Sequence, residues 1–423
     1  MSFDRVPAGA VVSGPAEADT EADPLPLYSE RFAADPDPCY REARARFGAL
    51  APGLLAPDVP VTVVIGYDTA LRILRNPEQF PADPRGWQRT AAAGCPMRPA
   101  LEYRPDARRS AGGEHERYRR VYLDGLEQVD QHGVLAVVER IAVPLINAFC
   151  GRGAADLRTE YAAPLAFQVI NHLLGIGGNA AEHAGRAVSA ILAAREAAAI
   201  DAAREELAAV LLDVIRQKVV APGMDMVSRL IAHPAELSEQ ELVSQIALTY
   251  EMGIEPLVSL ILNALRSMLA DEQLDGMLGG AVSTRDALDE VLFNDPPISH
   301  AGVVFPPRPQ LVDDVWLWEN RPVVVSLAGC NQDPAVRRRD PKTDTGVRGG
   351  NRSHLAWGLG DHACPASDIA LLIATAAIDQ LMDALPDMAL TVPAEQLSWR
   401  ADPFYRALTS LPVTFASAPP LPS

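Results

Sequence analysis

One short segment, running from Trp357 to Ala366 around Cys364, constrains the fold of this chain more than any other. Its glycines let the backbone turn sharply and come close to a flat ligand. A helix-forming run follows at 367–385, and the N–H groups at the start of such a helix point back toward the sulfur and favour the thiolate over the thiol. The segment therefore predicts a shaped loop that holds one thiolate at the start of a helix.

A single thiolate of this kind is the protein ligand that a haem iron requires, so Cys364 is predicted to be the axial ligand of a haem. A competing motif lies in the same stretch. Gly358 to Ala363 follow the pattern G-x-G-x-x-A of dinucleotide-binding loops, and Asp379 lies near the expected acidic position. That pattern must follow a buried strand, however, and residues 353–355 do not have the character of one. We therefore favour the haem ligand.

Two further interpretations of Cys364 stay open at this point. His354, His362 and Cys364 could together suggest zinc, but no second cluster of Cys or His completes a set of four ligands. A buried, unreactive cysteine beneath a glycine turn is the simplest alternative. Haem ligation remains the favoured interpretation of the segment.

Length and composition set broader limits. The 423 residues suggest two or three domains on length alone, but no linker divides the chain and no repeat appears. The net charge of −18 argues against general nucleic-acid binding. Cysteines are odd in number and widely spaced, so we expect no disulfide framework and a cytoplasmic location. Residues 1–24 are predicted to be a disordered tail, and no segment is interpreted as a membrane anchor.

The pattern along the chain is helical first and strand-like later. A strand is predicted at 59–66, a helix at 67–76 and a long irregular loop at 80–113. Helical periodicity then runs from 114 to about 271 and includes a long apolar helix at 238–269. Short strands are predicted at 302–305, 315–318 and 322–327. This order indicates a mainly α fold of the α+β class.

The cysteine segment and this order of elements together resemble the cytochrome P-450 superfamily, from about residue 26 to residue 415. The resemblance implies a single domain over 25–423, with haem b between the long central helix and the cysteine loop. Trp357 and Gly360 match residues that shape that loop around the haem. It also implies a monooxygenase whose small organic substrates enter beneath the loop at 80–113.

Other groups are suited to hold the haem. His115 and Arg119 are four residues apart, so they share one face of a predicted helix, and two cationic donors on one face suit a pair of propionates. The segment resembles the propionate-binding helix of the family. By the same resemblance His362 reaches a propionate beside the cysteine, and Arg308 completes the set from a strand. The simpler alternative for this helix is a solvated basic end.

The central helix departs from the family pattern. That pattern has a glycine, then an acid, then a threonine, and the acid and alcohol relay protons to dioxygen. Gly253 and Glu255 match the pattern, but Pro256 stands in place of the threonine. Proline has neither a hydroxyl group nor a backbone N–H. The usual proton relay is therefore not available, and atypical oxygen activation is expected.

Two more departures concern the haem-bracing residues. Glu290 matches the glutamate of the family's glutamate–arginine pair, but Phe293 replaces the arginine and Lys342 replaces a third charge. Because a buried carboxylate without a partner is costly, we expect Glu290 to find water or another cation, and Phe293 to pack into the apolar core. Pro365 follows the ligand directly, which removes one N–H that could point at the sulfur.

Three functions remain open. The first is a haem-thiolate monooxygenase that takes electrons from a ferredoxin, which would dock on a basic stretch containing Arg337, Arg338, Arg339 and Lys342. A solvated loop is the alternative interpretation of that stretch. The second function is a peroxide-driven peroxygenase or peroxidase, with Glu255 as its acid–base group. The third is a haem-binding scaffold protein without oxygenase activity.

Overall fold

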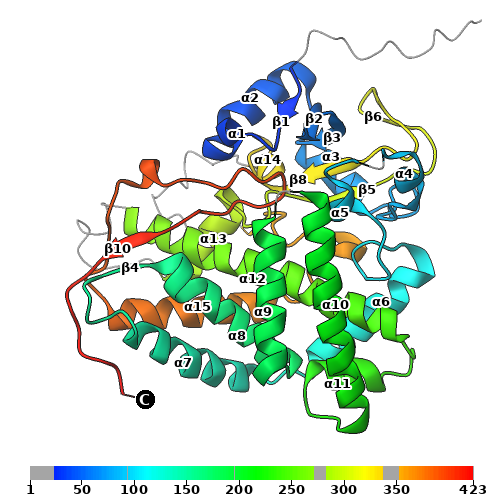
Figure 1. Cartoon of the computed structure of the whole chain (residues 1–423). Helices are drawn as coiled ribbons and strands as arrows, with labels where there is room; N and C mark the ends of the chain where they lie inside the picture. Colours follow the sequence, from blue (N-terminus) through cyan, green and yellow to red (C-terminus); the bar gives the residue numbers. More distant parts are fainter. Residues whose placement is uncertain (1–22, 93, 195, 271–282, 337–351, 423) are drawn as a thin grey trace, which may run out of the picture.

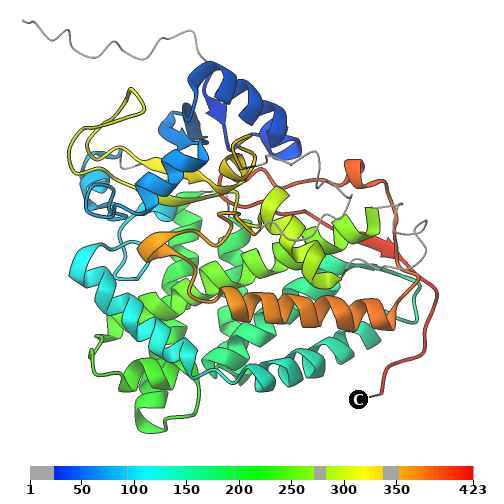
Figure 2. The same ribbon diagram turned by 180° about the vertical axis from the view of Figure 1, so that it is seen from behind.

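Helices from the middle of the chain form the body of the molecule, and a sheet forms one corner of it (Figures 1 and 2). The structure is a computed structural model, and it describes residues 23–92, 94–194, 196–270, 283–336 and 352–422. The predicted tail lies outside the described residues except for Asp23 and Pro24. Also outside them are Lys342 and the basic stretch Arg337, Arg338 and Arg339.

The five-stranded sheet joins the N-terminal part of the chain to residues 300–326. Its strand order is β1-β2-β3-β8-β5, with bounds Leu25–Pro26, Leu50–Ala56, Val59–Val64, Val323–Ser326 and His300–Val304. β3 runs parallel to β8, with Thr62 opposite Val323. Four helices accompany the sheet in this corner, namely α1 (Glu30–Ala34), α2 (Pro36–Phe47), α3 (Tyr67–Leu74) and α14 (Leu327–Asn331).

The helical body is built around α12 (Glu239–Ala270), which packs against α8, α10, α13 and α15. The other helices are α6 (Gly112–Glu127), α7 (Gln131–Asn147), α8 (Ala163–Leu174), α9 (Gly178–Ala193), α10 (Ala197–Val220), α11 (Met226–Ala232), α13 (Thr284–Asn294) and α15 (Ser367–Ala384). A π-helical turn, η1 (Arg158–Ala162), precedes α8. Three small strands, β4 (Ala154–Asp156), β10 (Pro412–Thr414) and β9 (Ala389–Leu390), form a second sheet at the edge of this body.

Two segments, Glu239–Ala270 and Gly360–Ala384, are long and apolar enough to cross a membrane by length and composition. Both are integral to the folded body, because α12 lies at its centre and α15 packs against α7, α12 and α13. The apolar window of the first is 61% buried inside the protein and that of the second is 33% buried.

The mainly α fold predicted from the sequence is confirmed, with two differences in detail. β2 was not predicted, because Pro52 and Gly53 interrupt its apolar run, yet it pairs along β3. The segment at 80–113 is not one irregular loop, since it contains α4 (Arg85–Thr90) and α5 (Arg98–Leu101). Trp87 in α4 is buried, so much of this segment belongs to the core.

Candidate functional site

A large cavity lies between α12 and the Cys364 loop. Its volume is about 290 Å³, and it opens to solvent. Its walls come from α3, α6, α8, α12, β5, α15 and the segment before α6. Most lining side chains are apolar, such as Phe80, Ile170, Leu248 and Ile298. The cavity therefore suits a large flat group together with an apolar molecule.

The Cys364 loop is held in a fixed shape by its backbone. The N–H of Cys364 donates to the carbonyl of Trp357 over 2.7 Å, which closes the loop on itself. Gly358 and Gly360 have φ angles of +71° and +72°, in the left-handed region that glycine adopts without strain. A Cβ at Gly360 would also collide with the carbonyl oxygen of Leu74 at the end of α3. Trp357 and Gly358 line the cavity, whereas Gly360 faces α3.

Cys364 lines the cavity just before α15, as predicted. Burial raises the pKa of its thiol, while the N–H of Ala366 and the charge of Arg119 act in the opposite direction. Because Pro365 has no N–H, the Ala366 amide is the group that donates to the sulfur. The amide at the helix start favours the thiolate, as expected, but burial has the larger effect on the pKa of the thiol. A metal ion bound to the sulfur would restore that form.

Arg119 and His362 line the same cavity as Cys364, as predicted. Burial lowers the pKa of His362 to about 3, and His115 and Arg119 push it in the same direction. His362 is therefore neutral near pH 7 in the absence of an anion, and it offers an N–H donor. Burial also lowers the pKa of Arg119, against the opposing effect of Cys364.

His115 lies behind His362 rather than on the cavity wall. The two rings are in contact, with centroids 4.0 Å apart and ring planes tilted by 41°. The Nδ1 atom of His115 is 2.8 Å from the carbonyl oxygen of Ala107, and its Nε2 atom is 3.2 Å from that of Asp361. His115 thus links the segment before α6 to the Cys364 loop, and it supports His362 in place.

The structure does not bring Arg308 to the site. Arg308 is exposed in the turn after β5 and is not among the residues that line the cavity. Two arginines that the sequence analysis did not select, Arg108 and Arg109, line the cavity instead. They stand next to each other in an acidic chain and shortly before His115, which is a signal that could have singled them out.

α12 forms the wall opposite the cysteine. Gly253 and Pro256 both line the cavity, as the family pattern implies. A proline cannot donate to the carbonyl four residues earlier, so the oxygen of Met252 lacks the usual helical hydrogen bond from residue 256. Met252 also lines the cavity.

Glu255 points away from the cavity and is only 2% exposed. Its carboxylate accepts hydrogen bonds from Arg158 over 2.9 and 3.1 Å, and it lies 3.4 Å from a guanidinium nitrogen of Arg400. It is not among the residues that line the cavity. The prediction that Glu255 acts as an acid–base group in the cavity is therefore not supported by this arrangement, in which it bridges η1, α12 and the C-terminal segment.

A pair of hydroxyl groups on the cavity wall was also missed. The hydroxyls of Tyr122 and Thr249 are 3.1 Å apart, and Thr249 donates to the carbonyl of Gln245 over 3.2 Å. Burial raises the pKa of Tyr122 to about 12, so its hydroxyl stays protonated. Tyr122 follows Arg119 by three residues on α6, a spacing that places both on one helix face.

Asp289, the neighbour of Glu290, carries two ion pairs on α13. Asp289 is buried, and its carboxylate accepts from Arg285 over 3.1 Å and from Arg352 over 2.8 Å. Glu290 and Phe293 are both partly exposed, so Phe293 is not enclosed in the core as expected. Arg352 therefore links α13 to the chain that leads to Cys364.

The side chains of the cavity fit a haem. Cys364 can serve as ligand, Arg119 and His362 offer donors for propionates, and Gly358 lets the backbone approach a flat group. No Asp or Glu belongs to the described residues that line the cavity, so nothing there opposes the binding of an anionic group. These groups lie together although they come from α6 and from a loop more than two hundred residues later.

Comparison with known proteins gives a consistent result. The sequence is 28% identical over 397 residues to the cytochrome P-450 monooxygenase PikC of Streptomyces venezuelae, covering 92% of this chain and 93% of PikC. It is 27% identical over 405 residues to vitamin D(3) 25-hydroxylase of Pseudonocardia autotrophica, covering 92% and 96%. The backbone matches CYP154C4 of a Streptomyces species with a TM-score of 0.84 at 24% identity, over 94% and 99% of the two chains. No family model matches the chain.

Proposed function

Because the chain belongs to the cytochrome P-450 superfamily, we propose that it binds haem b through Cys364 and oxidises a small organic substrate with atypical oxygen activation. One observation carries this proposal: Cys364, Arg119 and His362 line one apolar cavity, with α12 on its opposite wall. The ferrous–carbon monoxide spectrum of the purified protein tests the haem ligand, and product formation with a reductant tests the activity.

Each group on the cavity wall has a defined part in this proposal. When bound, the haem supplies the redox chemistry, and a thiolate ligand favours cleavage of the O–O bond. Arg119 and His362 would hold the propionates, while His115 fixes the ring of His362 from behind. Apolar side chains would exclude water and orient the substrate near α12.

Haem retention should depend on α6. We expect the double substitution of His115 and Arg119 by alanine to speed haem loss by roughly tenfold to a hundredfold, because a hydrogen bond to a charged group contributes about 1.5–3 kcal/mol. The rate of haem transfer to apomyoglobin measures this, with far-UV circular dichroism as a check on folding. Replacing the exposed Arg120 on the same helix is the control. Unchanged haem loss would mean that α6 does not contact the haem.

Oxygen activation should be poorly coupled in the natural protein. Pro256 offers no hydroxyl, and Glu255 is engaged by Arg158 and Arg400, so neither is placed to deliver a proton into the cavity. We expect Pro256→Thr to raise the amount of product per reductant several-fold, since a positioned acid–base group contributes roughly 10²–10⁴-fold to a rate. Pro256→Ala is the control, because it removes the ring without adding a hydroxyl. Equal coupling in both variants, or tight coupling in the natural protein, would contradict this account.

Peroxide-driven oxidation is the second candidate, and Pro256 is the observation that favours it. The oxygen of hydrogen peroxide is already reduced relative to dioxygen, so its use does not require the threonine hydroxyl that Pro256 replaces. The ion pairs of Glu255 argue against a peroxide mechanism in which this carboxylate transfers a proton to the oxidant.

A ferredoxin-type electron donor and a cytoplasmic location complete the monooxygenase proposal. Comparing turnover with peroxide and with a ferredoxin and its reductase separates the two candidates, and no turnover with either would indicate a haem-binding scaffold.

A further inference from the structure

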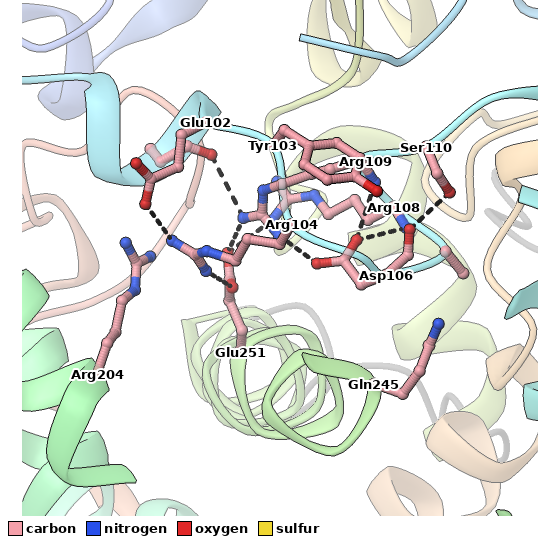
Figure 3. Close-up of polar contacts among 12 residues, drawn as sticks. Glu102, Tyr103, Arg104, Asp106, Arg108, Arg109, Ser110, Arg204, Gln245 and Glu251 are labelled. Atoms are coloured by element: carbon pink, nitrogen blue, oxygen red, sulfur yellow. Dashed lines mark hydrogen bonds and ion pairs between the residues drawn. The ribbon is translucent and has the colours of Figure 1, made fainter. Parts of the chain in front are cut away.

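A cluster of charged residues joins the segment between α5 and α6 to α12, and two of its members, Arg108 and Arg109, line the cavity. Figure 3 shows Glu251 of α12 pointing into several arginines of that segment, with Arg204 approaching from α10. Glu251 Oε1 accepts from Arg109 over 2.6 Å and from Arg108 over 2.9 Å, and Oε2 accepts from Arg104 over 3.3 Å. We name this set the Glu251 cluster; its members are Glu102, Arg104, Asp106, Arg108, Arg109, Arg204 and Glu251.

The Glu251 cluster holds four arginines and three carboxylates, so it carries an excess of one positive charge. Its members are largely shielded from water, with side-chain exposures of 1% for Asp106, 5% for Arg109 and 27% for Arg108. Burial would raise the pKa of Glu251, but the arginines lower it well below its ordinary value. Burial also lowers the pKa of Arg204 to about 10, with Arg104 acting in the same direction. These two pKa shifts reflect a high density of positive charge at this site.

The arginines differ in how fully they are engaged. Arg109 is buried and donates to Asp106, to Glu251 and to the carbonyl of Ala100. Arg108 is different, because within the described residues its side chain makes a single hydrogen bond, from Nη1 to Glu251. Its Nε and Nη2 atoms have no partner there, and Arg108 lines the cavity. Guanidinium donors that remain available on an otherwise apolar wall suit an anion.

From this geometry we infer that Arg108 is a recognition residue for a carboxylate on the substrate. The inference rests on the proposed function and adds the chemical class of the substrate, an organic acid with an apolar body. The body would lie against apolar lining residues such as Leu101, Leu248 and Ile298, while the carboxylate pairs with the free edge of the Arg108 guanidinium. Glu251 orients that guanidinium from behind. Arg119 and His362 remain for the haem.

The test compares matched acids and alcohols on the haem-loaded protein. Substrate-induced spin-state shifts are titrated with dodecanoic acid and 1-dodecanol, and with abietic acid and abietol. We expect at least one acid to bind more tightly than its alcohol, and high salt to weaken only the acid. Arg108→Gln should weaken binding of that acid by about tenfold to a hundredfold and leave the alcohol unchanged. Arg108→Lys should retain part of the preference.

The variants should fold, because Arg104 and Arg109 still meet Glu251 in them. Arg216→Gln, which removes an exposed arginine on α10, is the control. Three results would overturn the inference: no preference for either acid, an equal loss for acid and alcohol, or a loss of haem from Arg108→Gln, which would make Arg108 a propionate partner instead. A protein without the thiolate-type carbon monoxide spectrum would refute the proposed function itself, so the two failures are distinguishable.

Discussion

Replacing Cys364 with alanine should abolish the thiolate-type absorbance of the reduced protein bound to carbon monoxide. Among the described cysteines, Cys364 is the one whose side chain lines the cavity beside Arg119 and His362, so no other thiolate can replace it at that position. The loss should be complete rather than graded, because a missing ligand is not compensated by burial or charge. A difference spectrum on matched protein concentrations measures it.

Two controls make this result specific. Cys39→Ala removes a partly exposed cysteine in α2, far from the cavity lining, and should leave the spectrum unchanged. Far-UV circular dichroism of Cys364→Ala should remain close to that of the natural protein, since Cys364 precedes the first residue of α15. Persistence of the thiolate-type spectrum in Cys364→Ala would show that another residue is the ligand.

Glu251→Gln should destabilise the fold strongly. Removing one partner from a buried charge pair typically costs ~3–5 kcal/mol, because the opposite charge is left without compensation. The Glu251 side chain is 23% exposed, so we expect the lower end of that range, about 3 kcal/mol. Urea unfolding measures the free energy. Glu239→Gln removes an exposed carboxylate paired with Arg216 and should cost less than about 1 kcal/mol.

The loss of stability caused by Glu251→Gln should decrease at low pH. The pKa of Glu251 in the folded protein lies well below its ordinary value of 4.5, mainly because Arg109, Arg108 and Arg104 outweigh burial. Such a carboxylate stabilises the fold fully above pH 4.5 and loses that contribution as the pH falls toward the folded value. The difference between the natural protein and Glu251→Gln should therefore shrink below pH 4.5. A difference that is constant from pH 7 to pH 3.5 would show that charge is not the cause.

The sequence predicted best those features that depend on a few neighbouring residues. Glycines before Cys364 and a helix directly after it predict the ligand loop, because turn and helix signals act over a few residues. The i, i+4 spacing of His115 and Arg119 predicts a shared helix face, but it does not distinguish the cavity wall from the layer behind it. That distinction depends on the ring of His362, which contacts His115 in the fold but is far from it in the sequence.

Predictions failed where the answer depended on distant partners. Nothing near Glu255 in the sequence indicates that Arg158 and Arg400 will enclose its carboxylate, since they precede and follow it by about a hundred residues or more. Arg308 matched a family position in sequence alone, and the turn after β5 carries it into solvent. The pairing of Asp289 with Arg352 likewise crosses a long stretch of chain. Long-range ion pairs of this kind have no local pattern.

The Glu251 cluster also has a kinetic consequence. The segment between α5 and α6 is fastened to α12 through three arginines on one carboxylate, so it cannot swing aside without separating several buried charges at once. A substrate that entered beneath this segment could bind only after the segment had separated from α12, which costs much free energy and is therefore rare. The association rate of such a substrate would fall steeply on cooling. Ligands should instead enter and leave the cavity past other segments that surround it. Stopped-flow binding would then show association rates that respond little to Glu251→Gln, while the rate of dissociation of an acid held by Arg108 rises.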